Sequence, residues 1–582
     1  MKTQLTSNRW TVRRQFVLCV FGLLGLTLIG RALYLQFFEY DFYRNQGDAR
    51  HLRSVAIPAH RGNMHDRNGE PLAISTPIKT AWGMPEKLVQ QPAAMREVAA
   101  LLNISADDLI KKAETANSQG KEFMYVKRHI MPDVAKKISA LNVDGLGLLR
   151  EYRRYFPSGR AASQVVGFTD IDDVGREGLE LAYNDWLSGE AGTRRVVQDR
   201  TGREITGMDI VKPAVPGKDL RLSIDKQLQY FADQALIDVV KEHKAESASV
   251  VVMKVRTGEV LAMSNYPSYN PNDISDRTGG QQRNRSVTDV FEPGSTMKPF
   301  TIAAALESGK FKADDIVYTS PGYYSIGKYQ INDIRDNGWL DLRGIVRKSS
   351  NVGVSKVATQ LDPEQMWSVF DSFGFGRPPG SEFPGEVAGY FNHPILWHHI
   401  EQASISYGYG ISVSALQLVR AYSALANDGL LPSIAFIAND SPPEEGLRVL
   451  DKEIAREVRN MLESVVTDGT GHRAAIPGYR VAGKTGTSHR SVSGGYAEDR
   501  YVSVFAGFAP ASRPEFATVV VIHDPKGGQH FGSVVAAPVF ANVMGHALRI
   551  QNIEPDDVDT DNQSGQRVGL GPVLSPNGGD RS

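Results

Sequence analysis

The chain has almost no cysteine and almost no net charge. Its single cysteine, Cys19, excludes an intramolecular disulfide. Cys19 lies in the most apolar stretch of the chain, which favours a small packing or lipid-facing side chain over a reactive thiol. The formal charge of -1 provides no global field that would attract nucleic acid. The composition, 41% hydrophobic and 23% charged, is that of a folded protein, and 582 residues allow several domains.

Charged residues are also missing from a stretch near the N-terminus. None occurs between Phe16 and Gly30, and apart from Arg31 the apolar character continues to Phe38. Because about 20 apolar residues cross a bilayer as a helix, the sequence predicts a transmembrane helix over residues 16–38. Arg31 must then lie near an interface, where its guanidinium reaches water, or contact a partner. The alternative, a cleaved signal peptide, lacks a convincing cleavage site after the apolar run.

The residues that precede this helix are basic. They include Lys2, Arg9, Arg13 and Arg14, with no acidic residue among them. Basic flanks stay on the cytoplasmic side of a membrane. We therefore expect residues 1–15 to form a cytoplasmic tail and everything after the helix to be exported.

Periodicity and composition divide the exported part into three predicted segments. Residues 39–217 combine short helical patterns with turns and hold no dense cluster of candidate catalytic residues, which indicates an elongated α+β support module. Residues 218–550 begin with a strand, a helix over 225–243 and a hairpin over 249–264, and end with two strands and a helix. This pattern predicts an α/β fold, in which one mostly antiparallel sheet is assembled from distant segments and covered by helices. Residues 551–582, rich in Asp, Asn, Gly and Pro, are predicted to be disordered.

A turn signal occurs early in the support module. The Asn68-Gly69 pair predicts a tight turn between short extended segments. His60, Asp66 and Arg67 lie close to it and are candidates for catalysis. Because charged residues around a turn usually hold structure, we interpret all three as structural.

Three short motifs follow one another within residues 218–550. They are Ser295-Thr296-Met297-Lys298, Ser349-Ser350-Asn351 and Lys484-Thr485-Gly486-Thr487. A single copy means little, because the Ser-x-x-Lys pattern also occurs at Ser118–Lys121 and Ser325–Lys328. Only the Ser295 copy follows a Pro-Gly turn and opens an apolar helical run. The ordered set in one domain indicates a catalytic site.

The spacing of the first motif suits an activated serine. A serine hydroxyl is a weak nucleophile until a base accepts its proton. Residues three apart on a helix share a face, so Lys298 can reach Ser295. Lysine titrates near about 10.4, so Lys298 needs desolvation or a nearby cation to act as a base. Lys484 is a candidate for that cation and for binding a substrate carboxylate, while Pro299 places Ser295 at a helix start.

The motif set resembles that of the class B penicillin-binding proteins, and the resemblance extends over nearly the whole chain. It includes the basic tail, the single anchor, and the segments Arg61-Gly62, Asp66–Gly69, Phe383–Glu386 and Tyr407–Ser412. It implies a transpeptidase domain like that of serine β-lactamases over 218–550, preceded by a pedestal or dimerisation-type module. Within the class, the chain looks more like the septal cell-division branch of Gram-negative bacteria than like the elongation branch.

The resemblance implies a role for each catalytic residue. Ser295 would attack the D-Ala-D-Ala bond of a peptidoglycan stem peptide and form an acyl-enzyme. Lys298 would be the general base, and Ser349 would relay a proton to the leaving amine. Asn351 would bind Lys298 and the substrate amide.

The third motif would bind substrate. Lys484 and the hydroxyls of Thr485 and Thr487 would hold the substrate carboxylate, with Gly486 and Tyr409 completing this set. The backbone N–H groups of the nucleophile and of Thr487 would stabilise the oxyanion. No metal or organic cofactor is needed for such a reaction.

The resemblance also implies partners and a location. The partners would be peptidoglycan stem peptides, β-lactams bound covalently at Ser295, the membrane, and a division-specific membrane glycosyltransferase of the FtsW type with other divisome proteins. Nucleic acid is not among them. The protein would cross the bacterial inner membrane once, at the division septum, with its catalytic domain in the periplasm.

Several alternatives stay open. A carboxypeptidase or β-lactamase of the same fold would pass the acyl group to water. A β-lactam sensor would need a cytoplasmic effector domain, for which about 15 residues are too few. A scaffold with vestigial motifs would not need an intact set. His489 follows the third motif in a region that varies among relatives, and we interpret it as a solvated loop histidine rather than a substrate contact.

The basic flank makes the topology testable. A reporter that is active only in the periplasm, fused after His60, should be active, because the positive charges hold the N-terminus in the cytoplasm. A cytoplasmic reporter at the same position should be silent. Activity of the cytoplasmic reporter would contradict the predicted orientation.

Overall fold

The computed structural model describes residues 4–43, 52–198, 204–439, 446–492 and 494–557. The chain forms two compact units, each made of three stretches of sequence. The first unit comprises Met1–Arg61, Thr76–Arg153 and Ser188–Gly217, and the second comprises Gly62–Ser75, Arg154–Leu187 and Lys218–Ser582. Two stretches of the expected 39–217 module thus group with the second unit. The predicted disordered tail lies outside the described residues from position 558 onward.

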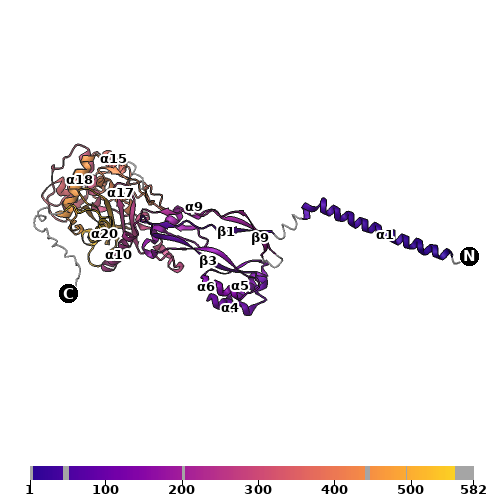
Figure 1. Cartoon of the computed structure of the whole chain (residues 1–582). Coiled ribbons are helices and arrows are strands. Elements are labelled where there is room, and N and C mark those ends of the chain that lie inside the picture. The colour runs from indigo at the N-terminus through magenta and orange to yellow at the C-terminus, as the bar shows by residue number, and fades with distance from the viewer. Residues whose placement is uncertain (1–3, 44–51, 199–203, 440–445, 493, 558–582) are drawn as a thin grey trace, which may run out of the picture. The chain divides into compact units, whose positions relative to one another are not determined.

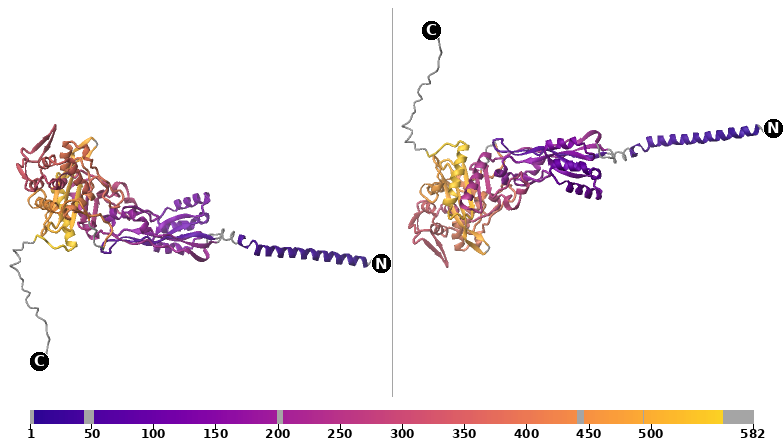
Figure 2. Two further views of the ribbon diagram at one scale, coloured as in Figure 1. Left: turned by 90° about the horizontal axis from the view of Figure 1, so that it is seen from above. Right: turned by 90° about the horizontal axis from the view of Figure 1, so that it is seen from below.

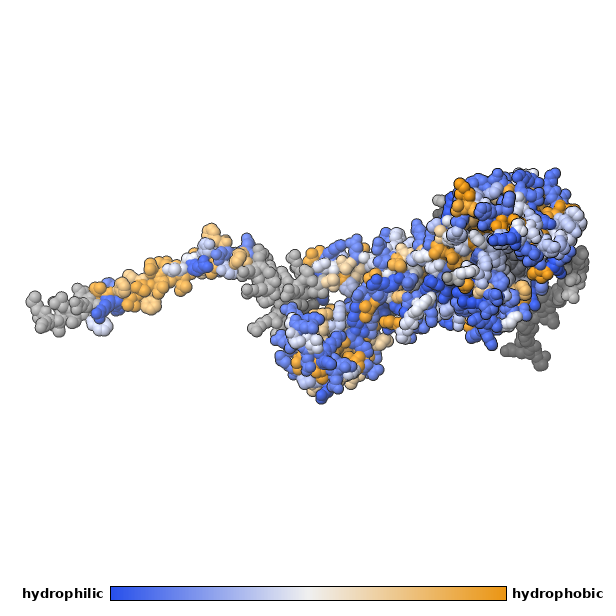
Figure 3. Space-filling model, turned by 180° about the vertical axis from the view of Figure 1, so that it is seen from behind, coloured by the Kyte–Doolittle hydropathy of each residue, from blue (hydrophilic) through white to orange (hydrophobic). Residues whose placement is uncertain are grey.

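Helix α1 (Gln4–Phe37) is long and apolar enough to anchor the chain in a membrane. Its window Trp10–Phe37 has a mean hydropathy of 2.2 and is not buried by the protein. Figure 3 shows the resulting band of hydrophobic surface. The helix begins before the predicted residue 16, because Gln4–Arg14 contains no glycine or proline that would interrupt it. Arg31 lies 3.8 Å from Glu39 and 5.2 Å from the centre of the Tyr34 ring.

A second apolar window, Gly532–Ile550, does not indicate another anchor. More than half of it, 56%, is buried inside the second unit, with a mean hydropathy of only 1.3. It belongs to the core of that unit.

The first unit contains two groups of strands, and its helices pack on the second of them. An antiparallel sheet has the order β1 (Leu52–Ile57), β8 (Gly192–Gln198), β9 (Glu204–Lys212). Strands β4 (Met124–Ile130) and β5 (Leu146–Tyr155) both pair with β3 (Pro71–Gly83), of which the residues between Thr76 and Arg153 belong to this unit. The helices are α3 (Pro85–Leu88), α4 (Pro92–Leu102), α5 (Ala106–Ser118) and α6 (Pro132–Ala140).

Helical periodicity explains the core of this unit. In α4, Met95, Val98, Ala99 and Leu102 recur at the spacing of one helix face, and all four are buried. They pack with apolar residues of α5, α6 and β4 in a single cluster.

One five-stranded antiparallel sheet organises the second unit. Its order is β12 (Val260–Tyr266), β11 (Ser247–Lys254), β21 (Phe516–His523), β20 (Gly495–Ala509), β19 (Ala482–Val492). The predicted hairpin of β11 and β12 is confirmed, and β11 pairs along its whole length with β21, from Ser247↔His523 to Lys254↔Phe516. The expected sheet built from both ends of the domain is therefore present.

Helices cover both faces of this sheet. Val250 and Val252 belong to the core under α10 (Lys226–His243) and α20 (Ala537–Ile550), whereas Val251 and Met253 belong to the core on the other face. Because both faces are buried, this strand has no polar alternation. Helices α12 (Lys298–Glu307), α17 (Ala415–Ala426) and α18 (Lys452–Thr467) contribute to the second core. Figures 1 and 2 show α10 and α20 side by side, although they come from opposite ends of the domain.

The predicted closing helix over 533–550 is wrong in one respect. It consists of two helices, α19 (Gly532–Val535) and α20, which are separated at Ala536. Pro538 explains the break, because its ring lacks an N–H and clashes with the carbonyl four residues earlier in a continuous helix.

Shorter elements complete the second unit. The strands are β2 (Met64–His65), β6 (Phe168–Thr169), β7 (Gly175–Glu177), β10 (Leu220–Arg221), β13 (Ile316–Tyr318), β14 (Tyr323–Ile326), β15 (Tyr329–Asn332), β16 (Trp339–Asp341), β17 (Leu430–Leu431) and β18 (Leu447–Arg448). The helices are α7 (Ser163–Val166), α8 (Gly178–Ala182), α9 (Asn184–Ser188), α11 (Arg285–Thr288), α13 (Leu342–Lys348), α14 (Asn351–Ala358), α15 (Pro363–Ser372) and α16 (His399–Ser406).

The charged residues around the Asn68-Gly69 turn are occupied by structural contacts. The Asp66 carboxylate accepts the N–H groups of Asn68 and Glu70, both at 2.8 Å, and of Lys226 at 3.1 Å. It therefore fixes the turn and the start of α10 together. Arg67 lies 3.8 Å from Glu259.

Candidate active site

The first motif lies where a short 3₁₀ turn leads into α12. Ser295 is half-buried in the turn Gly294–Met297, and Lys298 is the fully buried first residue of α12. Pro299 occupies the first helical turn, where a backbone N–H is not required. The sequence predicted Ser295 at the start of the helix, whereas the structure places it in the short turn that precedes the helix.

The second motif forms the junction of two helices. Ser349 ends α13 with φ 59° and ψ 40°, a left-handed conformation that costs a residue with a Cβ about 1–2 kcal/mol. Ser350 caps α14, since its hydroxyl accepts the N–H of Gly353 at 2.8 Å. Asn351 is the first residue of α14.

The third motif lies on β19, the last strand of the sheet. Lys484 is fully buried, and Thr485 and Gly486 are buried beside it. A Cβ on Gly486 would lie 2.6 Å from the carbonyl oxygen of Pro293, so only glycine allows β19 to pack against the nucleophile segment.

The three motifs meet at the hydroxyl of Ser349. The Lys298 Nζ lies 3.1 Å from Ser349 Oγ, 2.5 Å from the Ser349 carbonyl oxygen and 2.8 Å from Asn351 Oδ1. The Lys484 Nζ lies 3.0 Å from the same Ser349 Oγ. Among the described residues, no hydrogen bond joins Lys298 Nζ to Ser295 Oγ. Such a bond often tightens only when substrate is present.

Burial changes the protonation of both lysines. Desolvation lowers the pKa of Lys298 well below its usual value of 10.5; the charge of Lys484 lowers it further, and that of Asp333 opposes the change. Desolvation lowers the pKa of Lys484 to about 7. The structure therefore provides both conditions that a lysine base needs, low solvation and a neighbouring cation.

The threonines of the third motif have partners within the protein. Thr485 Oγ1 lies 3.1 Å from Thr470 Oγ1, and the Thr487 hydroxyl accepts the N–H of Gly532 at 2.9 Å. Because the Thr487 oxygen is the acceptor in that bond, its own proton remains available for an anion.

Tyr409 and His489 lie beside the third motif. The His489 N–H points to the Tyr409 hydroxyl at 3.4 Å, and its Nδ1 lies 2.9 Å from the carbonyl oxygen of Ala497. The interpretation of His489 as a solvated loop residue is wrong, because it lies within strand β19, half-buried against the ring of Tyr501. The strand continues beyond the motif because β20 is long enough to pair with it.

Asp333 is a residue of the site that sequence reasoning missed. Its carboxylate accepts the N–H groups of Asn351 at 2.5 Å and Val352 at 3.0 Å, and the Ser350 hydroxyl at 2.5 Å. It therefore holds the start of α14. The neighbouring Asn332 carbonyl accepts Asn351 Nδ2 at 3.1 Å. No motif surrounds Asp333, so the sequence carried no signal for it.

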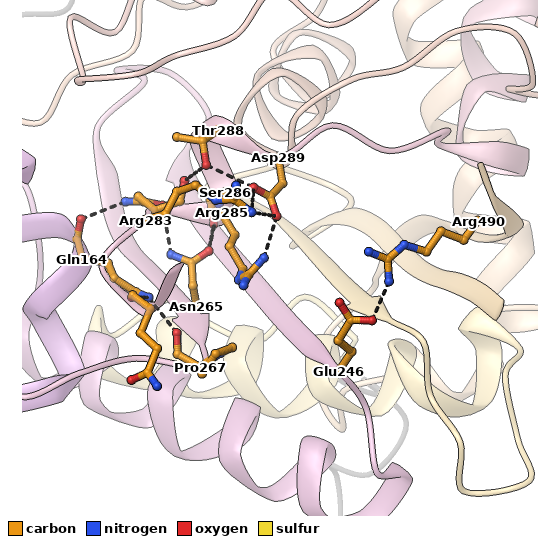
Figure 4. A network of polar contacts seen from close by, with 12 residues as sticks. Gln164, Glu246, Asn265, Pro267, Arg283, Arg285, Ser286, Thr288, Asp289 and Arg490 are labelled. Carbon is orange, nitrogen blue, oxygen red and sulfur yellow. Dashed lines mark hydrogen bonds and ion pairs between the residues drawn. The ribbon is translucent and has the colours of Figure 1, made fainter. Parts of the chain in front are cut away.

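A buried polar network fixes the segment that leads to the nucleophile (Figure 4). Asn265 of β12 accepts the N–H of Ser286 at 2.8 Å and its hydroxyl at 2.7 Å, and donates to Asn284 at 2.9 Å. Another pair in the same view joins Glu246 and Arg490 at 2.5 Å and ties the start of β11 to β19.

Comparison with known proteins agrees with this geometry. Residues 248–545 match the family of the penicillin binding protein transpeptidase domain, and residues 56–222 match the penicillin-binding protein dimerisation domain. The chain is 41% identical, over 95% of its own length and 95% of the relative's, to the probable peptidoglycan D,D-transpeptidase PenA of Neisseria gonorrhoeae. The chain belongs to the class B penicillin-binding proteins.

Two further likenesses extend over most of this penicillin-binding protein. It is 40% identical to the peptidoglycan D,D-transpeptidase FtsI of Escherichia coli K12, over 94% of its own chain and 93% of the relative. A crystal structure of a peptidoglycan synthetase from Bifidobacterium adolescentis matches with a TM-score of 0.70 at 26% identity, covering 88% of this chain and 98% of that one.

The nucleophile of this penicillin-binding protein can be tested by covalent labelling. Ser295→Ala should abolish labelling by a fluorescent penicillin, because no hydroxyl remains to be acylated. Lys298→Ala should slow labelling by about 10²- to 10⁴-fold, the usual contribution of a general base. Ser118→Ala and Ser325→Ala, in the two other Ser-x-x-Lys sequences, should label normally. Normal labelling of Ser295→Ala would refute the assignment.

The charge of Asp333 acts on Lys298, which makes a testable prediction for the pH dependence of acylation. Asp333 raises the pKa of Lys298, so Asp333→Asn should lower that pKa further. Lys298 would then stay deprotonated at lower pH, and the acid limb of the pH profile for acylation by penicillin should move to lower pH. Asp362→Asn, at the cap of α15, is the matched control and should leave the limb in place. An unmoved limb in a folded Asp333→Asn variant would contradict this electrostatic role.

Proposed function

We propose that the protein is a serine-type peptidoglycan D,D-transpeptidase that forms an acyl-enzyme at Ser295. The observation that carries the proposal is the Ser349 hydroxyl, which lies 3.1 Å from the buried amine of Lys298 and 3.0 Å from that of Lys484. The half-buried Ser295 lies in the turn that leads into Lys298. The family and the printed names of the relatives support the same activity.

Acylation follows from the protonation of the site. Neutral Lys298 accepts the Ser295 proton as Oγ attacks the carbonyl carbon of the D-Ala-D-Ala bond, and the carbonyl electrons move to the oxygen. Backbone N–H groups of Ser295 and Thr487 stabilise this oxyanion. Collapse of the intermediate breaks the C–N bond. The proton held by Lys298 reaches the leaving amine through Ser349, the hydroxyl within reach of both lysines.

Substrate binding is assigned to the remaining motif residues. Lys484, when protonated, pairs with the terminal carboxylate of the stem peptide, and Thr485 and Thr487 provide hydroxyls next to it. Asn351 holds Lys298 and has its amide close to the cleft. Gly486 allows β19 to approach the segment that carries Ser295, and Tyr409 contacts the same strand at His489.

The second half-reaction decides between transfer and hydrolysis. An amine held in attack geometry can reach an effective molarity of about 10⁵ M or more, far above that of bulk water. The acyl group therefore passes to the amine of a second stem peptide, which restores Ser295 and forms the cross-link. A β-lactam adduct blocks that acceptor and leaves only water.

We assign this activity to septal wall synthesis. The likeness to the FtsI relative over 94% of the chain supports that role. The apolar helix α1 with its basic flank supports a single-pass inner-membrane protein with a periplasmic catalytic domain. A division-specific membrane glycosyltransferase and other divisome proteins are the partners we propose.

The stability of the β-lactam adduct tests the proposal. Intact-protein mass spectrometry after a pulse of penicillin and removal of free drug should find one added drug mass on the Ser295 peptide. That mass should persist for many minutes, because the excluded acceptor cannot release it. Return of the unmodified mass within seconds would support a β-lactamase instead.

A further inference from the structure

Two small pairs of antiparallel strands, one enclosed within the other in sequence, precede the second motif and expose large apolar side chains. The antiparallel pairs are β13 with β16 and β14 with β15. Their exposed side chains, 47–95% accessible, are Ile316, Tyr318, Tyr323, Tyr329, Ile334 and Trp339. Such a concentration of exposed apolar side chains marks a binding surface more often than it occurs by chance.

A groove lies between these strand pairs and helix α14. Its volume is about 600 Å³, and Tyr318, Tyr324, Lys356 and Gln360 are among the residues that line it. Trp339 is not among the lining residues, but its ring centre lies 4.7 Å from that of Tyr318, which lines the groove. We call Tyr318, Tyr324, Trp339 and Lys356 the aromatic groove.

Lys356 orders the aromatic groove. Its Nζ donates to the Tyr318 carbonyl at 2.8 Å and lies 6.0 Å and 5.5 Å from the ring centres of Tyr318 and Tyr324. An ammonium has three donors. One is used for the carbonyl, so further donors face the groove beside flat apolar rings.

This combination suits a saccharide better than a protein. A sugar ring presents an apolar C–H face for an aromatic plane and hydroxyl or acetamido groups at its edge. The core of a protein interface is depleted of charge. Here Lys310, Asp315, Lys356 and Gln360 line the same groove as the tyrosine rings. The groove volume is within the range of about 300–1,000 Å³ of small-ligand sites.

The aromatic groove and the second motif share helix α14. Asn351, a residue of the second motif, begins α14, and Lys356 follows it by five residues on the same helix. At a rise of about 1.5 Å per residue this is roughly 8 Å along the axis. The hairpin itself contacts the motif, since the Asn332 carbonyl at the end of β15 accepts Asn351 Nδ2.

We propose that the aromatic groove binds sugar units of the glycan strand that carries the reacting stem peptide. The proposal rests on the proposed transpeptidase function. A stem of roughly four residues before the scissile bond spans at most about 14 Å. A strand whose stem reaches Ser295 must therefore pass close to the cleft, and the aromatic groove lies on the helix that Asn351 begins.

Binding of peptide-free glycan tests the groove directly. Soluble glycan strands, stripped of stem peptides with an amidase and labelled at one end, should bind the full-length protein in detergent. Tyr318→Ala and Trp339→Ala should each weaken binding by about tenfold, the size of an aromatic stacking contribution. Trp339→Phe should restore most of it. Tyr230→Ala, a similarly exposed ring on α10, is the matched control and should not change it.

Turnover separates this inference from the proposed function. Trp339→Ala should raise KM for a glycan-linked stem substrate, while a free synthetic stem peptide and penicillin labelling of Ser295 behave as in the wild type. Failure of wild-type Ser295 to be labelled would defeat the proposed function. Normal labelling with equal glycan affinity in the wild type and Trp339→Ala would defeat only the aromatic groove. The proposal for the aromatic groove would also be overturned if Trp339→Ala kept its affinity for glycan but no longer bound a protein partner.

Discussion

The structure depends on the burial of two lysine amines around one serine hydroxyl. Lys298 and Lys484 are both withdrawn from water, and each lies about 3 Å from Ser349 Oγ. Two ammonium ions cannot both be stable so close together in a dry site, because burial and mutual repulsion each favour the neutral form. The pair shares fewer protons than two free lysines would hold at neutral pH. One can then act as a base while the other attracts an anion.

Rigid elements maintain this arrangement. Lys298 begins a helix, Ser349 ends one, and Lys484 lies in a strand that glycine holds against the nucleophile segment. Asp333 restrains the α13–α14 junction through three hydrogen bonds. The unfavourable left-handed backbone of Ser349 persists because helices on both sides determine it. Sites built on such elements keep their geometry better than sites on loops.

The sequence predicted the parts of the molecule that local patterns encode. Helical spacing located α10 within one residue, and two short apolar runs around a turn located β11 and β12. The ordered motifs identified the residues that meet at Ser349. The sequence also contained the signal for the break between α19 and α20, because Pro538 cannot lie inside a continuous helix. The helical periodicity on both sides of Pro538 led to the prediction of a single helix.

Other features depend on distant contacts that a local pattern does not contain. Asp333 matters only because the hairpin brings it to the backbone of Asn351. His489 was predicted to lie in a loop. It lies in a strand only because β20 pairs with this part of the chain, and that pairing is not visible in the local sequence. The membership of Gly62–Ser75 and Arg154–Leu187 in the second unit likewise follows from tertiary packing, not from composition.

The strand order of the catalytic sheet has a consequence for how the protein is made. Strand β11 occupies an interior position between β12 and β21, and its residue Ser247 pairs with His523. During synthesis the hairpin of β11 and β12 emerges early, with one edge unpaired. That edge stays open until the last strand arrives, after both serine motifs and Lys484 have been translated. Such long-range pairing makes folding slow and leaves an aggregation-prone edge in the nascent chain. The central sheet can thus close only after β21 has been made, and a product truncated before β21 lacks the strand that joins β11 to β20.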